Sequence, residues 1–494
     1  MNAPLSPPTR EASPEVTTII LGILMAMFLA ALDQTIVATA MPTLGRDLGD
    51  LEHLPWVVTS YLLASTAVAP LYGKLSDIYG RRVMMLTGIW IFLVGSIACA
   101  LAPSMLALVV ARAVQGLGGG GLISLAQTII ADVVPPRDRP RYQVHIASVF
   151  VAASVAGPVL GGLFADYVHW SLIFWINLPI GLVALAMTSS RLKLLPRHER
   201  YHRLDLLGAL LMVCASTTLL MALTWGGVSY PWASLQVLGL LFGSVLLWIG
   251  FTWRLLTAAE PFLPLNLFSN SVVRRATLAS GFTMGTFIGL TIYAPIYLQA
   301  VVGLSAADSG LALIPLMAGT VTGAMTSGRS MARVKHYKRV PMVGLAISIA
   351  AVGALTVWPS QMPLWLLEVL FGLTSFGLGT VLPVVTISIQ NAVPLHQLGT
   401  ATANMNFFRS LGGAVAVAAF GAILFGGLSA GGDDLRSLDD LVRESNRDVL
   451  AGVFRWVFFA SGVGLALALL SLALMKELPL RASIAHAADS TIAD

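Results

Sequence analysis

Charged residues are scarce in this chain. They make up 11% of its 494 residues, against 56% hydrophobic residues, whereas soluble domains carry about 25% charged residues. A water-soluble protein of this length could not cover its surface with so few charges, so a soluble globular fold is excluded. The apolar residues occur in blocks of about 20, the length that crosses a bilayer core of about 30 Å.

Cysteine is almost absent as well. Cys99 and Cys214 are the only two, and both lie within apolar blocks. The sequence therefore predicts neither a disulfide framework nor a cysteine metal site, and we expect no metal and no cofactor. The segment 1–15 is polar and rich in proline, and it lacks the pattern of a signal peptide. This composition favours a cytoplasmic tail.

Fourteen apolar blocks follow one another, which predicts an all-α polytopic membrane protein with both termini in the cytoplasm. Lys and Arg test this orientation, because cytoplasmic loops are enriched in them. Of the 29 basic residues, 22 fall in expected cytoplasmic segments, five outside and two within spans. Membrane orientation thus explains the net charge of +5 better than nucleic-acid binding does. The expected spans are 16–41, 54–73, 83–102, 105–131, 143–165, 171–190, 206–225, 235–256, 276–301, 307–327, 341–357, 364–391, 400–425 and 451–475.

The blocks group as six, two and six. A weak internal echo links the two sets of six: Arg112 and Gly116 in the fourth block have counterparts in Glu368 and Gly372 in the twelfth. Two related six-span halves are typical of secondary transporters. The predicted organisation is a tail 1–15, a six-span bundle 16–190, a basic linker 191–204, a two-span insertion 205–257, a second bundle 258–476 with an acidic outer loop 429–449, and a tail 477–494.

The most specific motif is a short loop with the pattern G-x-L-x-D-x-x-G-R-R. It runs through Gly73, Asp77, Gly80, Arg81 and Arg82. Glycines let two helix ends approach closely, and a carboxylate in this place can pair with the arginine four residues on or cap the positive end of a neighbouring helix. We expect a cytoplasmic gating loop; the alternative is an ordinary basic loop.

This loop resembles the signature between the second and third spans of the major facilitator superfamily. Residues 32–42, 112–120 and 156–162 resemble motifs of its 14-span drug:proton antiporters, and weaker likeness continues at 260–265, 299–303 and 409–413. The resemblance covers nearly the whole chain. It implies the major facilitator fold, proton coupling, and export of amphipathic compounds, cationic ones included.

Asp33 and Arg112 are charged residues inside apolar spans, and such residues are expensive in hydrocarbon and commonly functional. Both lie roughly 12–13 Å from the outer surface, at 1.5 Å per residue. We expect them to face one central cavity and to interact directly or through water. A neighbouring arginine favours the ionised carboxylate and loss of hydration favours the protonated one, so such a site can load and release a proton. The alternative is a permanent ion pair that locks two helices.

Gly157, Pro158, Gly161 and Gly162 form the antiporter-like motif of the fifth span. Proline removes a backbone donor and glycine allows close packing. We expect a hinge and outer seal where the two halves meet, with simple close packing of helices as the alternative.

Other polar residues inside spans are further candidates. Glu368 is either a second protonation site or an outer-interface residue that reaches water. Arg409 needs an acidic or carbonyl partner that the sequence does not name. Tyr residues near span ends are commonly interface anchors. The residues proposed to line the cavity or contact substrate are Gln34, Gln115, Tyr293, Tyr297, Gln299, Asn404 and Arg409.

These observations favour a proton-coupled exporter of drugs or toxic small molecules. It would act as a monomer in the plasma (inner) membrane, with protons, a small-molecule substrate and lipid as partners. The alternatives are an importer of a small organic solute, an exporter of one metabolite or siderophore, and a membrane sensor. No nucleophile–base or metal constellation points to an enzyme, and nothing points to nucleic acid.

Overall fold

The computed structural model describes residues 14–49, 53–54, 56–191, 205–227, 230–258, 261–263, 267, 269–331, 336–360, 362–430 and 447–480. These residues form helices joined by short connections. Within the described ranges, the only extended pairing is a single bridge between Gly226 and Tyr230. The predicted linker 191–204 and the predicted acidic loop 429–449 lie mostly outside the described residues. The all-α prediction is confirmed for the described part of the chain.

The first bundle contains the helices that precede the linker. These helices are apolar on all sides, toward lipid and toward neighbouring helices. Packing against the neighbours, and not a single apolar stripe, therefore sets the position of each helix. α1 is longer than the predicted span at both ends. The helices are α1 (Pro14–Leu48), α2 (Trp56–Tyr79), α3 (Arg81–Ala100), α4 (Met105–Val133), α5 (Arg139–Tyr167), α6 (Leu172–Trp175) and α7 (Asn177–Arg191).

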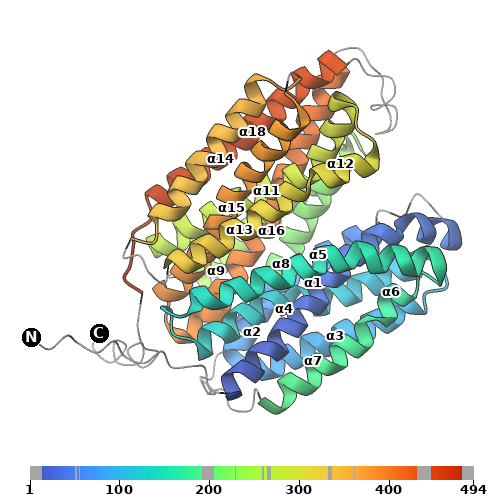
Figure 1. Ribbon diagram of the computed structural model, residues 1–494. Coiled ribbons are helices and arrows are strands. Elements are labelled where there is room, and N and C mark those ends of the chain that lie inside the picture. The colour runs from blue at the N-terminus through green and yellow to red at the C-terminus, as the bar shows by residue number, and fades with distance from the viewer. Residues whose placement is uncertain are drawn as a thin grey trace, which may run out of the picture.

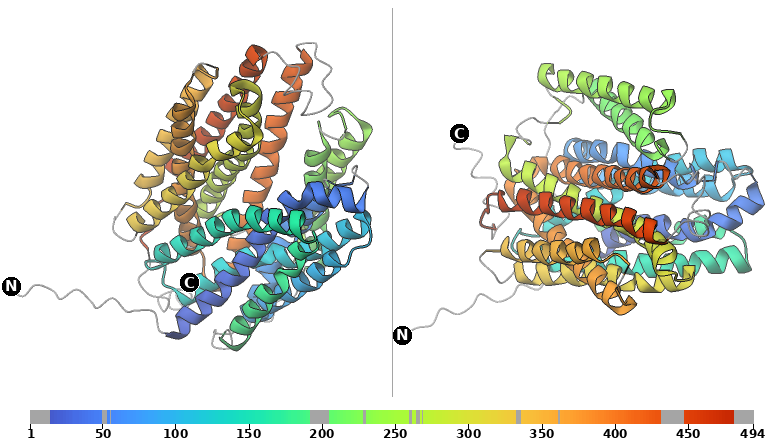
Figure 2. Two further views of the ribbon diagram at one scale, coloured as in Figure 1. Left: turned by 45° about the vertical axis from the view of Figure 1, so that its right-hand side comes forward. Right: turned by 90° about the horizontal axis from the view of Figure 1, so that it is seen from above.

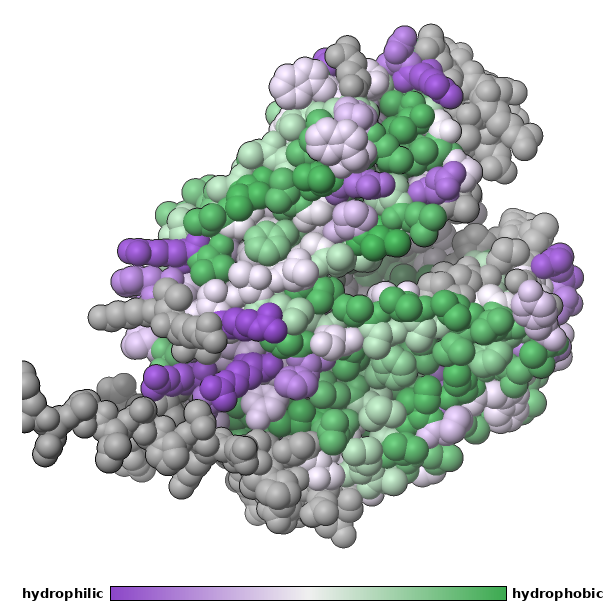
Figure 3. Space-filling model, in the orientation of Figure 1, coloured by the Kyte–Doolittle hydropathy of each residue, from purple (hydrophilic) through white to green (hydrophobic). Residues whose placement is uncertain are grey.

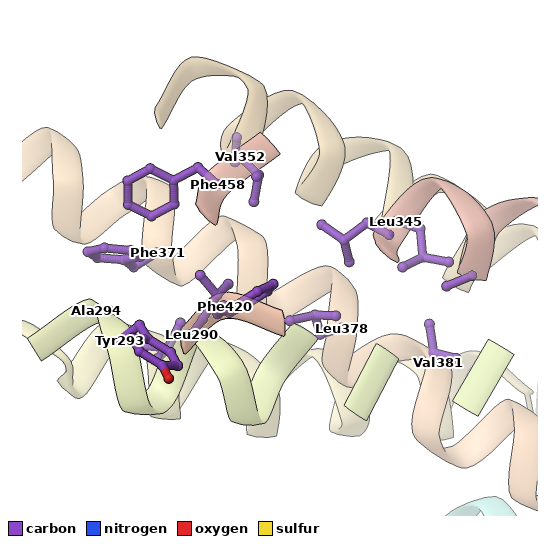
Figure 4. Close-up of a cluster of buried hydrophobic side chains, with 14 of the residues drawn as sticks. Leu290, Tyr293, Ala294, Leu345, Val352, Phe371, Leu378, Val381, Phe420 and Phe458 are labelled. Carbon is purple, nitrogen blue, oxygen red and sulfur yellow. The ribbon is translucent and has the colours of Figure 1, made fainter. Parts of the chain in front are cut away.

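The second bundle is built in the same way, and its buried side chains form one large apolar core. Figure 4 shows this core between α11, α14, α15, α16 and α18, with Leu378, Phe371 and Phe458 among its members. The elements are α11 (Ser271–Tyr297), the π-helix η2 (Leu298–Val302), α12 (Ala306–Ala312), α13 (Ile314–Met331), α14 (Arg339–Val357), α15 (Leu364–Ala392), the 3₁₀-helix η3 (Leu395–Gln397), α16 (Leu398–Ala430) and α18 (Arg447–Ala473).

Two predicted spans are interrupted. The sixth breaks between α6 and α7, three residues before Pro179, and the tenth breaks between α12 and α13, two residues before Pro315. Proline lacks an N–H group and its ring clashes with the carbonyl of the preceding turn, so it is tolerated in the first turn of a helix but not in its middle. Each span therefore restarts at its proline.

Helices α8 (Leu206–Trp225) and α9 (Leu235–Thr257) form a separate hairpin. α8 packs on α2 of the first bundle and on α16 of the second, and α9 lies outermost (Figure 2). Arg254 Nε donates to Asp205 Oδ1 at 2.8 Å, and the same carboxylate caps α8 by accepting from Gly208 N at 3.0 Å. The hairpin thus covers one seam between the bundles.

Thirteen helical segments of the described chain are long and apolar enough to cross a membrane. The exception among the expected spans is α2, which has 24 residues but carries Lys74, Asp77 and several hydroxyl side chains. Figure 3 shows apolar side chains over the flanks of the molecule and hydrophilic ones toward its two ends. The chain is a multi-pass membrane protein, and the count of fourteen spans stays a prediction.

The two bundles touch at one end of the molecule and diverge toward the other (Figures 1 and 2). We call the end where α1 begins and α18 ends the closed end, and the opposite one the open end. At the closed end α2 packs against α16, and α5 against α13. A Cβ on Gly328 of α13 would lie 2.9 Å from the Pro140 oxygen of α5. Figure 3 shows a hollow between the bundles at the open end.

The chain that follows α18 folds back over the closed end of the second bundle. Lys338 Nζ donates to the oxygens of Ala473 and Met475 at 2.7 and 2.8 Å, and its backbone N–H donates to Glu477 at 3.0 Å. Tyr337 donates to the Leu478 oxygen at 2.9 Å. The start of the predicted tail 477–494 is therefore packed, because Glu477 and Leu478 are held by hydrogen bonds from the residues that precede α14.

Candidate functional site

Asp33 and Arg112 form an ion pair inside the first bundle. Arg112 Nη1 donates to Asp33 Oδ2 at 2.6 Å. Gln115, one turn further along α4, donates to Asp33 Oδ1 at 2.8 Å and accepts from Arg112 at 2.5 Å. A spacing of three residues places Arg112 and Gln115 on one helix face. An interaction, direct or through water, was expected from their matching depth, and the structure shows the direct one.

Two further helices complete the polar cluster. Asn177 at the start of α7 donates to Asp33 Oδ1 at 2.9 Å. Ser96 on α3 accepts from Gln115 at 2.8 Å and from Asn177 at 3.3 Å. We call Asp33, Ser96, Arg112, Gln115 and Asn177 the Asp33 network. Sequence reasoning missed Ser96 and Asn177; the available signal was an amide at the break of the sixth span.

The Asp33 network is shut off from the space between the bundles. Asp33 is 0% and Arg112 1% exposed. Arg112 Nε donates to the Val57 oxygen at 3.0 Å, and its guanidinium stacks on the Tyr61 ring, 4.4 Å from the centroid. The expectation that the pair faces a central cavity is therefore wrong for this conformation, because α2 covers the pair.

Glycines make this close assembly possible. A Cβ on Gly95 of α3 would lie 2.5 Å from the Gln115 Cα, and one on Gly116 of α4 would lie 2.6 Å from the Tyr61 oxygen. No real Cβ approaches backbone atoms this closely, so any side chain at either position would push the helices apart. The two glycines therefore hold α3 and α2 against the face of α4 that carries Arg112.

Asp77 joins the two bundles at the closed end. Its Oδ1 accepts from Gly399 N at 3.1 Å, and its Oδ2 accepts from Thr400 N at 2.8 Å and from Thr400 Oγ1 at 2.6 Å. Gly399 and Thr400 begin α16, so the carboxylate of one bundle caps the positive end of a helix in the other. We call Asp77, Gly399 and Thr400 the closed-end latch.

Arginines surround the latch. Arg81 is hydrogen-bonded to Asp77 through Nη1 and donates from Nε to Asp132 Oδ2 at 2.8 Å. Arg82 Nε donates to the Ser189 oxygen at the end of α7, at 3.0 Å. The expected pairing of Asp77 with Arg81 and the expected capping of a neighbouring helix both occur. Arg81 holds Asp77 in place, and Arg82 ties the loop to its own bundle.

The glycines of this loop have separate roles. A Cβ on Gly73 would lie 2.4 Å from the Ala403 Cβ and 2.6 Å from the Gly399 oxygen, so Gly73 lets α2 touch α16. Gly80 has φ of 92° between α2 and α3, a conformation that L side chains rarely adopt. The first glycine permits contact between bundles, and the second permits the sharp turn.

The antiporter-like motif lies on α5 and packs within its own bundle. A Cβ on Gly157 would lie 2.0 Å from Thr35 Oγ1 of α1. Gly161 is buried, a Cβ on Gly162 would meet nothing within 4 Å, and the helix runs through Pro158 without a break. The expected outer seal between the halves is not formed in this conformation, because the bundles are apart at the open end. The contact seen is close helix packing.

Arg409 lies where α11, α15 and α16 of the second bundle meet, and it is partly exposed. Its Nε donates to Ser280 Oγ at 2.5 Å and its Nη2 to Thr386 Oγ1 at 3.0 Å. Weaker bonds run from Nη1 to Asn406 Oδ1 at 3.3 Å and from Nη2 to the Leu382 oxygen at 3.4 Å. The carbonyl partner that the sequence could not name is the Leu382 oxygen, and all four acceptors are uncharged.

Amide side chains connect the bundles just beneath Arg409. Asn406 Nδ2 donates to Gln127 Oε1 of α4 at 3.0 Å, and Gln390 Nε2 donates to the Gln127 backbone oxygen at 3.3 Å. We call Gln127, Gln390 and Asn406 the amide bridge. Sequence reasoning missed all three residues, because uncharged amides in spans carry no spacing that identifies a partner.

Glu368 is partly exposed on the second turn of α15. Among the described residues it makes no ion pair, in contrast to Arg112 at the echoed position of α4. Partial exposure lets water stabilise its charge, so this placement favours the outer-interface alternative over a second protonation site.

The two tyrosines proposed to line the cavity lie instead in the core of the second bundle. Figure 4 shows Tyr293 beside Leu290, Ala294 and Phe420, and its hydroxyl donates to the Val417 oxygen at 3.0 Å. Tyr297 is 1% exposed and donates to the Pro359 oxygen at 2.5 Å. Both predictions were wrong, because each hydroxyl finds a backbone acceptor while its ring packs in the apolar core.

The remaining candidates are dispersed. Gln34 is exposed on α1. Gln299 lies in η2 and donates to Ser309 Oγ of α12 at 3.1 Å, which ties two segments of one bundle together. Asn404 is 0% exposed, and neither of its amide atoms has a hydrogen-bond partner among the described residues. Of the proposed cavity residues, the structure brings only Gln115 to the Asp33 network and Arg409 to the amide bridge.

Comparisons with known proteins agree with this architecture. Residues 23–417 match the model of the Major Facilitator Superfamily. Multidrug resistance protein 3 of Bacillus subtilis is 35% identical over 407 residues, covering 82% of this chain and 79% of its own. An uncharacterised MFS-type transporter of Mycobacterium tuberculosis is also 35% identical over 407 residues, and the chain spans 58% of that protein's length.

Among solved structures, the human organic anion transporter superimposes with a TM-score of 0.65 at 17% identity. The match covers 93% of this chain and 100% of that one. Identity this low supports the fold alone.

Proposed function

The chain belongs to the major facilitator superfamily, and we propose that it is a proton-coupled antiporter that exports amphipathic drugs or toxic small molecules. It is a multi-pass membrane transporter of small molecules and not an enzyme. The observation that carries the proposal is the Asp33 network. Its carboxylate has 0% exposure inside a membrane bundle, and ionisable groups in such places are costly in free energy and commonly functional.

Asp33 is the group that takes up and releases the proton. In this conformation its carboxylate accepts hydrogen bonds from Arg112, Gln115 and Asn177. Protonation removes its charge and weakens the bond to Arg112. The helices that hold these groups, α1, α4 and α7, can then pack in a second way when Asp33 is protonated.

α4 connects this event to the contact between the bundles. It carries Arg112 at the network and Gln127 at the amide bridge, 15 residues or about 22 Å apart along the helix. A shift of α4 on protonation therefore acts on the bond between Gln127 and Asn406. This link supports alternating access, in which the two halves rock around a central site.

We propose further that the closed end is cytoplasmic, that α2 completes fourteen spans, and that the chain acts as a monomer in the plasma (inner) membrane. The arginines beside the closed-end latch, Arg81 and Arg82, support this orientation. With the closed end in the cytoplasm, the open end of this conformation faces the outside of the cell. The hairpin α8–α9 is an insertion between the bundles, and we assign it no part in coupling.

Energetics permit the proposed coupling. One charge crossing 100 mV is worth about 2.3 kcal/mol, and one pH unit is worth about 1.4 kcal/mol. The export direction is supported by the name of the Bacillus subtilis relative. An importer of the same fold remains the competing function, and so does an exporter of one dedicated metabolite or siderophore.

Asp33→Asn tests the proton role. The variant keeps the size of the side chain but cannot exchange a proton. We therefore expect efflux of a dye panel driven by a pH gradient to fall by at least about tenfold, the concentration ratio that a gradient of roughly one pH unit supports. The measurement is dye efflux and dye-induced proton release in vesicles. Lys338→Gln at the closed end is the matched control.

Unchanged coupled efflux in Asp33→Asn would sink the proton assignment. Dye accumulation rather than extrusion under the natural gradient would favour the importer.

A further inference from the structure

Arg409 is a charged side chain inside the second bundle whose charge has no counterpart among the residues it contacts. Ser280, Thr386, Asn406 and the Leu382 carbonyl supply only uncharged acceptors. Arg112, inside the first bundle, has a carboxylate at 2.6 Å. A guanidinium in a poorly polar medium gains most from an anion, so this one offers a place for an anion from outside the chain.

The position of Arg409 makes it reachable. The amide bridge, in which Asn406 and Gln390 bond to Gln127, closes the space between the bundles. Arg409 follows Asn406 by three residues on α16, about 4.5 Å further toward the open end. Its side chain points to α11 and α15 rather than to lipid, and it is partly exposed. It therefore lies on the open-end side of the amide bridge, the side on which the two bundles diverge (Figure 1).

The hydrogen bonds of Arg409 divide into two that fix it and two that can be exchanged. The bonds to Ser280 at 2.5 Å and Thr386 at 3.0 Å hold the guanidinium in place. The bonds to Asn406 at 3.3 Å and to the Leu382 oxygen at 3.4 Å are long, and long bonds are weak. They leave from Nη1 and Nη2, the pair of nitrogens that bind a carboxylate or a phosphate in parallel.

We propose that Arg409 is the substrate-recognising cation of this transporter and that its preferred substrates are amphipathic acids, with a carboxylate, sulfonate or phosphonate group. The proposal rests on the proposed transport function and narrows its substrate class from amphipathic compounds in general to anions. The acid group binds Nη1 and Nη2, and the apolar part of the molecule lies against the walls of the hollow.

Asn406 connects this site to the conformational change. Its Oδ1 accepts from Arg409, and its Nδ2 donates to Gln127 of the other bundle. A bound acid displaces Asn406 from Nη1, whereas closing the amide bridge returns Asn406 to it. Formation of the closed end therefore competes with the acid for Arg409 and favours its release into the hollow.

The test uses three probes with the same aromatic ring and different charge: 2-naphthoate, 2-naphthamide and 2-naphthylmethylammonium. Binding to the purified full-length protein in detergent is followed by intrinsic tryptophan fluorescence. We expect naphthoate to bind about tenfold or more tighter than the amide, and the ammonium to bind weakest, since a charge-assisted bidentate pair is worth at least that ratio.

Two variants locate the effect. Arg409→Gln removes the cation, and Asn406→Asp places a resident carboxylate beside an unchanged Arg409. Both are expected to bring naphthoate binding to the level of the amide while amide binding is unchanged. Arg455→Gln, at an exposed arginine of α18, is the matched control and keeps the preference.

Several results would overturn the proposal. They are a wild-type protein that binds the acid no better than the amide, or that binds neither, and an Asn406→Asp variant that keeps the full preference. The assay needs no proton gradient, so it tests the acid site alone, whereas efflux by Asp33→Asn tests proton coupling. Failure of the acid site and failure of proton coupling are therefore distinguishable.

Discussion

The two bundles share one architecture but treat buried charge in opposite ways. The first encloses Asp33 and Arg112 together, with 0% and 1% exposure, so its charges cancel within the protein. The second holds Arg409 alone among uncharged partners and leaves it partly exposed. The comparison teaches that a paired charge is suited to an internal switch and a single accessible charge to binding something from outside.

The echoed positions of α4 and α15 sharpen this contrast. Gly116 packs against α2, and Gly372 lies beside Pro315 of α13, so both helices meet their neighbours at corresponding places. Arg112 is the eighth residue of α4, whereas Glu368 is only the fifth of α15. A difference of three residues is about 4.5 Å of depth. The deeper residue is enclosed and the shallower one reaches the surface.

Removal of one partner of the buried pair should have the largest effect. Arg112→Leu leaves Asp33 charged and enclosed, and we expect a loss of about 3–5 kcal/mol of stability. Arg409→Leu leaves only neutral groups behind, so it should cost less, about 1–3 kcal/mol. Thermal unfolding of the purified proteins compares the two.

The double variant Asp33→Asn/Arg112→Leu is the control for this contrast. It leaves no enclosed charge, so it should recover most of the stability without recovering proton coupling. If Arg112→Leu and Arg409→Leu proved equally destabilising, the distinction between the two halves would fail.

Loss of the latch should have an intermediate effect, on conformation rather than on folding. Asp77→Asn removes the negative charge from the first turn of α16 and the ion pair with Arg81. Charge-assisted bonds of this kind are worth about 1.5–3 kcal/mol, so the closed end should open more often. The alkylation rate of Ala403→Cys, buried at this contact, should therefore rise by about tenfold or more, because about 1.4 kcal/mol is a factor of ten in an equilibrium.

Arg141→Gln is the matched control, because Arg141 is exposed on α5 near the same end. It should leave the alkylation rate as it is. An Asp77→Asn variant with the wild-type rate would show that the latch does not hold the bundles together.

The smallest effect is expected at Glu368. Glu368→Gln removes a partly exposed carboxylate without an ion pair in the described structure, and exposed charges contribute about 0–1 kcal/mol. Efflux of the dye panel and its dependence on pH should stay within about twofold of the wild type. A shift in the pH dependence of efflux would instead make Glu368 a second proton-binding site, and both halves would then take part in proton coupling.

Parts of the fold and the site could be predicted because they depend on local properties. The lengths of the apolar blocks predicted most helices, whereas the interruptions near Pro179 and Pro315 were not predicted. The loop with Asp77 was predicted to pair with Arg81 and to cap a helix, and it does both. Which helix it caps was not predictable, because Thr400 is 323 positions away and no local pattern refers to it.

The errors have a common physical cause. Tyr293 and Tyr297 were expected to line a cavity, yet the rotation of α11 places both in the apolar core. Asp33 and Arg112 were expected to face the space between the bundles, and α2 covers them instead. In a helix that is apolar all round, composition does not tell the lipid side from the protein side.

The sequence alone determined that this chain crosses a membrane many times, belongs with the major facilitator transporters, and has Asp33 and Arg112 at one depth. These properties follow from hydropathy, motif spacing and the fixed rise of the helix. Only the tertiary structure decided that Ser96, Gln115 and Asn177 enclose that pair and that Arg409 contacts no carboxylate among the residues that the structure describes. Contacts between helices depend on how each one is rotated and packed, and distant parts of the chain set this jointly.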